Sequence, residues 1–153
     1  MPDMLVKLYD LPPINAIDGV TVRRARPYEI TRVAEFVTAH FARSWADEIS
    51  VGYANKPTSV WIAIEGGEVV GFAAAECTSR GFFGPTGVAP DQRGRGVGRA
   101  LLLAALHGLR EIGYAYAIIG GVGPADFYAR AVGATLIDGS TPGIYGDGLK
   151  KRP

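Results

Sequence analysis

A glycine-rich loop that leads into a leucine-rich segment is the feature that most constrains the fold of this chain. The loop is Arg93-Gly94-Arg95-Gly96-Val97-Gly98, and the apolar spacing after it predicts a helix to about Ile112. Glycine has no Cβ, so the backbone N–H groups of such a loop can approach an anion closely. The first N–H groups of a helix have no partner within the helix, and the helix dipole is positive at that end. The loop therefore predicts a site for a phosphate or a pyrophosphate.

Two well-known nucleotide-binding loops do not match this stretch. A P-loop requires Gly-x-x-x-x-Gly-Lys followed by Ser or Thr, and the sequence contains no such string. A dinucleotide-binding fingerprint requires Gly-x-Gly-x-x-Gly or Ala, but counting from Gly94 or from Gly96 places Arg99 or Leu101 at its last position. Taken alone, the loop is also compatible with a tight strand-to-helix turn that binds no ligand.

Length, charge and cysteine content narrow the class of protein. A chain of 153 residues predicts a single domain over residues 1–153. The net charge of +1 gives no support for binding to nucleic acid or to a membrane surface. Cys77 is the only cysteine, which suits a reducing compartment and excludes a cysteine-rich metal site. We find no signal-peptide pattern and no apolar run of roughly 20 residues, so we expect a cytoplasmic protein without a metal or a membrane span.

The order of the predicted elements indicates a mixed α/β fold. Strands are predicted at residues 4–9 (as an edge strand), 20–25, 60–65, 68–77, 82–90, 114–119, 135–137 and 143–145. Helices are predicted at residues 27–41, 44–53 and 124–132, and from the glycine-rich loop to about Ile112. Gly66-Gly67 suits the turn of a hairpin. The strand "FFGPTGVAP" contains Gly84, Pro85 and Gly87 in its interior, which predicts a bulge and interrupted pairing with a neighbouring strand.

The loop and its surroundings resemble a known family. Arg93-x-x-Gly96-x-Gly98, preceded by Val88-Ala89-Pro90, is similar to motif A of the GCN5-related N-acetyltransferases (GNAT), Gln/Arg-x-x-Gly-x-Gly/Ala. The resemblance extends over nearly the whole chain, to the helix that carries "DFYARAVGA". It implies the GNAT fold: a mostly antiparallel sheet of six or seven strands with helices on both faces. Two parallel strands, here 83–89 and 115–119, are splayed apart in that fold.

The resemblance implies acetyl-CoA as the co-substrate and direct transfer of its acetyl group to a primary amine of a small molecule or peptide. The pantetheine and the acetyl carbonyl are expected to pair with the backbone of the bulged strand, and the pyrophosphate with the glycine-rich loop. The cofactor-binding residues expected on this basis are Thr86, Gly87, Val88, Arg93, Gly94, Arg95, Gly96, Val97, Gly98, Arg99 and Tyr128.

Two catalytic residues are expected on the same basis. Tyr128 matches the tyrosine that serves as general acid for the departing CoA thiolate, and Glu76 is the candidate base acting through water. The family commonly has Tyr-x-x-x-Gly-Phe, whereas here four residues separate Tyr128 from Gly133, and no asparagine precedes this helix. The alternatives are that Tyr128 and Phe127 are core aromatics and that Glu76 is a surface residue.

The acceptor side is less defined by the sequence. Trp45, Tyr53 and Phe82 are candidates for the wall of the acceptor pocket, and Asp47 and Glu48 for attracting a cationic amine. The resemblance also implies a homodimer, through residues 4–9 and the region of residues 144–145. The alternative function is an acyl-CoA sensor or pseudoenzyme that binds the co-substrate without transferring its acyl group.

Overall fold

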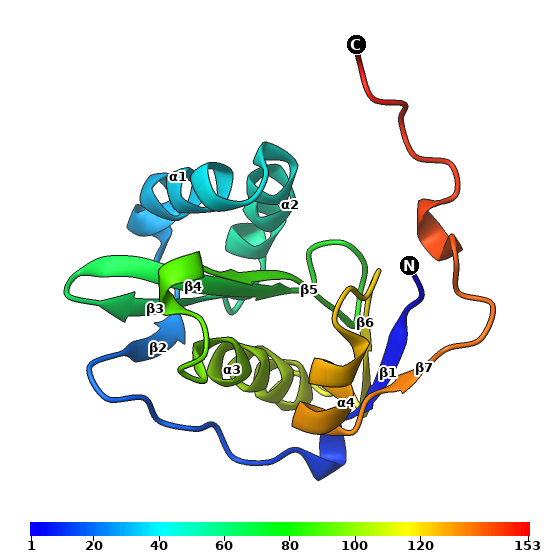
Figure 1. The fold of residues 1–153 in the computed structure, drawn as a ribbon, viewed down its shortest axis with the longest axis horizontal. Coiled ribbons are helices and arrows are strands. Elements are labelled where there is room, and N and C mark those ends of the chain that lie inside the picture. The colour runs from blue at the N-terminus through cyan, green and yellow to red at the C-terminus, as the bar shows by residue number, and fades with distance from the viewer.

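A computed structural model describes residues 1–153 as a seven-stranded sheet with helices on both faces, as the resemblance implied (Figure 1). The strands are β1 (Met4–Lys7), β2 (Thr21–Arg24), β3 (Val60–Glu65), β4 (Glu68–Ala75), β5 (Phe82–Val88), β6 (Tyr116–Ile119) and β7 (Thr135–Leu136). The helices are α1 (Ile30–His40), α2 (Arg43–Ala54), α3 (Val97–Glu111) and α4 (Ala125–Val132), with short 3₁₀ turns at Leu8–Asp10, Pro27–Glu29, Pro90–Gln92 and Gly143–Tyr145. None of the helices has the length and hydrophobicity that a membrane crossing requires.

The strand order is β2-β3-β4-β5-β6-β1-β7, and every neighbouring pair is antiparallel except β5 and β6. Two expectations about the ends of the chain were wrong. β1 is not an edge strand: it pairs with β6 on one side and β7 on the other, because Met4 and Val6 are buried in the core. Residues 143–145 form a 3₁₀ turn instead of a strand, since Pro142 precedes them and Gly143 adopts a φ of +59°.

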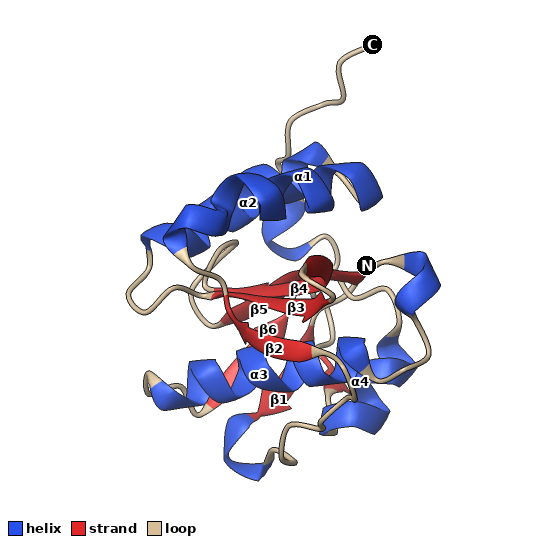
Figure 2. Cartoon of the chain, turned by 90° about the vertical axis from the view of Figure 1, so that its left-hand side faces the viewer, coloured by secondary structure: helices blue, strands red, loops and turns tan.

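The two faces of the sheet carry separate hydrophobic cores. α3 and α4 pack against one face, where ten residues of α3 are buried, and α1 and α2 pack against the other, over β3 and β4 (Figure 2). In β4 the alternation of a strand divides neighbouring residues between the two cores: Ala73 and Ala75 face α3, whereas Phe72 and Ala74 face α1 and α2. A ligand that passes between two strands therefore meets α3 on one side and the α1–α2 pair on the other.

The packing of α3 on the sheet depends on one glycine within the helix. A Cβ on Gly108 would lie 2.4 Å from Cζ2 of Trp61, a buried residue of β3. The Arg24 guanidinium lies over the indole, 4.6 Å from the ring centroid, and its Nη2 would lie 3.3 Å from the same Cβ. Because Trp61 is only 5% exposed, its ring has little room to move away from the helix.

We predict that Gly108→Ala lowers stability although alanine is the better helix former. Alanine favours an exposed helix by about 1 kcal/mol, but overpacking against Trp61 costs about 1–3 kcal/mol. The measurement is the free energy of unfolding in urea. Gly98→Ala is the matched control, because its Cβ would meet the nearest atom of Val88 at an ordinary 3.6 Å. Equal or higher stability of Gly108→Ala would contradict the contact.

Candidate functional site

The site is built around a gap between the two parallel strands. β5 and β6 pair only at Phe82 with Ile118 and at Phe83 with Ile119, and diverge beyond that point. On its other side β5 pairs with β4, and the register shifts between Ala73 and Ala75, where Gly84 and Pro85 lie on β5. The predicted bulge and the predicted interruption of pairing are both confirmed. The rest of β5 has one edge without a neighbouring strand.

The free edge of β5 presents backbone polar groups to the gap. The Ala89 N–H donates to the Val70 carbonyl on the β4 side, and successive residues of a strand direct these groups to opposite edges. The N–H and C=O groups of Thr86 and Val88 therefore face the gap. The Arg93 side chain agrees with this assignment, because its Nε donates to the Val88 carbonyl at 3.2 Å. An extended ligand can pair with this edge as an added strand would.

One end of the gap is the N-terminus of α3. Gly96 is the N-cap residue with a φ of +84°, and no side chain caps the helix. The first N–H groups of α3 therefore remain free for an anion, and the helix dipole favours negative charge there. Gly94, with a φ of +82°, makes the preceding turn.

Asn15 holds this loop and was not predicted from the sequence. Its Nδ2 donates to the Gly96 carbonyl at 3.1 Å, and its Oδ1 accepts from Arg99 at 3.0 Å. The contact joins residues more than 80 positions apart, so no local pattern signals it.

Arg95 points away from the site, which corrects its predicted role in binding the pyrophosphate. Its guanidinium donates to both carboxylate oxygens of Glu65, at 3.1 and 2.8 Å, and also bonds Gln92 and the Asp18 carbonyl. Arg95 thus ties the loop to the β3–β4 hairpin. Positive charge within the site comes from Arg93 and Arg99 instead.

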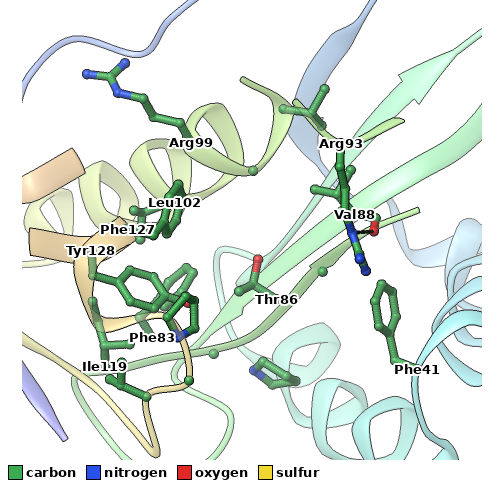
Figure 3. Close-up of a pocket in the computed structure, with 18 of the residues that line it drawn as sticks. Phe41, Phe83, Thr86, Val88, Arg93, Arg99, Leu102, Ile119, Phe127 and Tyr128 are labelled. Carbon is green, nitrogen blue, oxygen red and sulfur yellow. Dashed lines mark hydrogen bonds between the residues drawn. The ribbon is translucent and has the colours of Figure 1, made fainter. Parts of the chain in front are cut away.

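A cavity of about 820 Å³ runs through the gap and joins these elements (Figure 3). Its size suits a small-molecule ligand. Predicted cofactor-binding residues that line it are Thr86, Gly87, Val88, Arg93, Gly94, Gly96, Val97, Gly98, Arg99 and Tyr128. The structure thus gathers in one cavity every predicted cofactor-binding residue except Arg95.

Tyr128 lies at the opposite end of this cavity from Arg93 (Figure 3). Its ring packs edge-to-face against Phe83 and Phe127, and the residue is only 6% exposed. Burial raises the pKa of its hydroxyl to about 12. The phenol therefore keeps its proton throughout the physiological pH range. The ring is a core aromatic, as one alternative held, but it also lines the cavity.

Glu76 is not brought to the cavity. Its Oε1 accepts from the Gly81 N–H at 2.6 Å, and it lines a separate cavity together with Asn55 and Leu109 of α3. Glu76 adopts a φ of +62°, so its carboxylate and backbone shape the turn between β4 and β5. This position does not support the predicted role as base.

Phe41 and Trp45 form an aromatic wall on the α1–α2 side of the cavity. Their rings stack with centroids 5.5 Å apart, and Phe41 also contacts Phe72. A Cβ on Gly87 would lie 2.4 Å from Cζ of Phe41, so the absence of a side chain lets this ring rest on β5. Trp45 was predicted for the acceptor side and Phe41 was missed, although both lie at the connection of the two predicted helices.

The other residues predicted for the acceptor side lie elsewhere. Tyr53 and Asp47 line a groove between α1 and α2, and Phe82 does not line the cavity. The Glu48 carboxylate accepts a hydrogen bond from the Thr78 hydroxyl and is also outside the cavity lining. The helix faces explain these differences: Phe41 and Trp45 face β5 at the gap, whereas Tyr53 lies two turns further along α2.

Comparison with known proteins points to one family. The Acetyltransferase (GNAT) domain model matches residues 56–131, about half of the chain. This range begins after α1 and α2 and includes the loop, α3 and most of α4. No curated protein matches the sequence.

Solved structures share the fold at low sequence identity. A GCN5-related N-acetyltransferase from Sphaerobacter thermophilus superposes with a TM-score of 0.73 and 24% identity over 89% of this chain and 48% of its own. A GNAT family acetyltransferase from Brucella melitensis, in complex with acetyl-CoA, gives a TM-score of 0.60 and 22% identity over 77% of this chain and 86% of its own.

A third match is a GCN5-related glucosamine N-acetyltransferase region of a fungal multi-domain enzyme, with a TM-score of 0.71 and 18% identity over 89% of this chain and 19% of its own. The chain thus spans less than half of two of these three proteins. The matched domain model and the shared fold agree, and the chain belongs to the GCN5-related N-acetyltransferase superfamily.

Proposed function

We propose that this protein transfers the acetyl group of acetyl-CoA directly to a primary amine of a small molecule or peptide. The observation that carries the proposal is the continuity of one cavity from the free N-terminus of α3, along the unpaired edge of β5, to Tyr128. A pyrophosphate suits the first part, and an amide-containing chain that can accept and donate hydrogen bonds suits the second.

A cytoplasmic location and a homodimer stay predictions. β1 is paired on both edges and has no free edge for a partner strand.

The two faces of the sheet give the reactants separate approaches. The phosphate-binding end lies on the α3 face, whereas Phe41 and Trp45 line the α1–α2 face of the same gap. The acceptor amine therefore approaches from the α1–α2 side and attacks the thioester within the gap. A backbone N–H on the free edge of β5, from Thr86 or Val88, is placed to donate to the carbonyl oxygen as negative charge develops on it.

Tyr128 is proposed to stabilise the leaving sulfur by donating a hydrogen bond. With a pKa raised to about 12, the phenol is a weaker acid than a thiol of pKa about 8.5. Complete transfer of its proton to the thiolate is therefore unfavourable unless the phenol is reprotonated at the same time. The nitrogen loses a proton in the same reaction, so a relay through the phenol from nitrogen to sulfur balances the step.

We expect Gly98→Asp to weaken the binding of acetyl-CoA. The carboxylate would lie within the first turn of α3, where it suits the helix dipole but repels a phosphate. Isothermal titration calorimetry with acetyl-CoA measures the effect, and Gly98→Asn is the uncharged control of the same shape. The Asp variant should bind at least about 10-fold more weakly than the Asn variant, about 1.4 kcal/mol. Equal affinity of the two variants would show that no anion binds at this helix end.

We expect the two arginines of the loop region to differ in their effect on affinity. Arg95→Gln removes a surface ion pair with Glu65 and should change the Kd for acetyl-CoA by less than about 3-fold. Arg99→Gln removes a cation that lines the cavity and should weaken binding by about 10-fold and reduce its dependence on salt. Calorimetry at two salt concentrations distinguishes them. A larger loss for Arg95→Gln would place its guanidinium at the phosphates after all.

We expect Tyr128→Phe to lower kcat by about 10- to 100-fold and to leave the Kd for acetyl-CoA unchanged. The hydroxyl forms no hydrogen bond within the protein, so its removal should not destabilise the fold. Because the pKa is raised to about 12, this group should cause no loss of activity between about pH 7 and about pH 10. Release of CoA thiol measures the rate. Full activity of Tyr128→Phe would remove the role proposed for the hydroxyl. If the unaltered protein binds acetyl-CoA but acetylates no amine, the alternative function of a sensor or pseudoenzyme is favoured.

A further inference from the structure

The chemistry of the cavity wall carries information about the acceptor. On the α1–α2 side the wall is aromatic, formed by Phe41 and Trp45, with Phe72 packed behind both rings. These rings offer apolar area and no hydrogen-bond acceptor. An acceptor that binds here must therefore present an apolar or aromatic group beside its amine.

The ionised side chains that line the cavity are both cationic. They are Arg93 and Arg99, and neither forms an ion pair with a carboxylate. The Nε of Arg93 donates to the Val88 carbonyl, and in Figure 3 its guanidinium points toward the Phe41 ring. An ammonium group at the aromatic wall would lose its hydration with no carboxylate in the cavity lining to pair with, which is costly.

The carboxylates around the site accept hydrogen bonds from the protein and lie outside the cavity lining. Asp3 accepts from the Gly121 N–H at 2.9 Å, and Glu48 accepts from the Thr78 hydroxyl. Glu76 accepts from the Gly81 N–H, and Tyr145 lies beside Gly120. His40 is exposed, with its ring packed on Phe36 at a centroid distance of 4.7 Å. None of the carboxylates and neither histidine lines the cavity, so no carboxylate or imidazole within it can take a proton from an ammonium.

We infer that the acceptor is a weakly basic primary amine beside an aromatic or apolar group, and not a polyamine or a lysine side chain. The inference rests on the proposed acetyl transfer. A neutral nitrogen forms the N–C bond with the acetyl carbon as the C–S bond breaks. The proton lost by nitrogen passes to the CoA sulfur, so the reaction needs no external base. Aromatic amines and the α-amine of a peptide with an aromatic first residue share this chemistry.

The basicity of the amine decides how much of it can react. A peptide α-amine has a pKa of about 8, so about one molecule in ten is neutral at pH 7. A lysine ε-amine, with a pKa of about 10.4, is neutral in roughly one molecule in a few thousand. A site that binds only the neutral form therefore favours the α-amine, and an aromatic amine is neutral throughout.

The test compares four acceptors with the unaltered protein: aniline, phenylalanyl-glycine amide, Nα-acetyl-lysine amide and spermidine. At pH 7 we expect kcat/KM from thiol release to be at least about 10-fold higher for phenylalanyl-glycine amide than for the lysine compound. The kcat/KM for phenylalanyl-glycine amide should rise with pH and level off above the pKa of its own amine, about 8. The rate with aniline should be independent of pH between about pH 6 and about pH 9. The relative rates with aniline and with phenylalanyl-glycine amide identify whether an aromatic amine or a peptide α-amine is preferred.

Two variants control for the surroundings of the wall. His40→Asn should leave the pH profiles unchanged, because the imidazole lies outside the cavity. Phe41→Leu should raise the KM of the acceptor without changing the Kd for acetyl-CoA. A preference for spermidine or the lysine compound would overturn the inference. It would also be overturned if the rate with aniline depended on pH and His40→Asn removed that dependence. Binding of acetyl-CoA with no acetylation of any of the four amines would also overturn it, whereas failure to bind acetyl-CoA would reject the proposed function itself.

Discussion

The separation of β5 from β6 is the constraint on which the site depends. The two strands pair at only two positions, and beyond Phe83 the edge of β5 has no neighbouring strand. Unpaired backbone groups inside a protein are costly unless a ligand or water satisfies them. The gap is therefore both a local loss of sheet stability and a ready site for an extended ligand. The bulge at Gly84 and Pro85, together with the α3 N-terminus that follows, holds that edge in place.

The two cores stabilise the sheet around this gap. α3 buries most of its length against one face, and α1 and α2 cover the other over β3 and β4. Beyond their two paired positions, β5 and β6 are thus held by packing on both faces and not by hydrogen bonds to each other. Close contacts that require glycine occur on both sides, at Gly108 against Trp61 and at Gly87 against Phe41. The contact at Gly108 positions α3, whose N-terminus forms one end of the gap. The contact at Gly87 positions the aromatic wall of Phe41 and Trp45.

The charges of the site suit the proposed co-substrate and underlie the acceptor that we infer. Under the proposed function, the free helix N–H groups, Arg93 and Arg99 suit the phosphates of acetyl-CoA. The lining offers no carboxylate to an ammonium group, which is the basis of the inferred acceptor. Arg95, which the sequence places in the same loop, is held by Glu65 and does not line the cavity. Arg93 and Arg95 of a single loop therefore bond different partners.

The sequence by itself determined the glycine-rich loop, the bulged strand and the element order, because each is a local pattern of glycine, proline or apolar spacing. Those patterns led to the family, the sheet and most of the cavity lining. Only the tertiary structure decided the direction of Arg95, the engagement of Glu76 with Gly81, and the place of β1 between two strands. It also brought Asn15 to the loop and Phe41 to Gly87. These are contacts between residues distant in the sequence, and local spacing carries no information on which of the compatible partners a side chain meets in the folded chain.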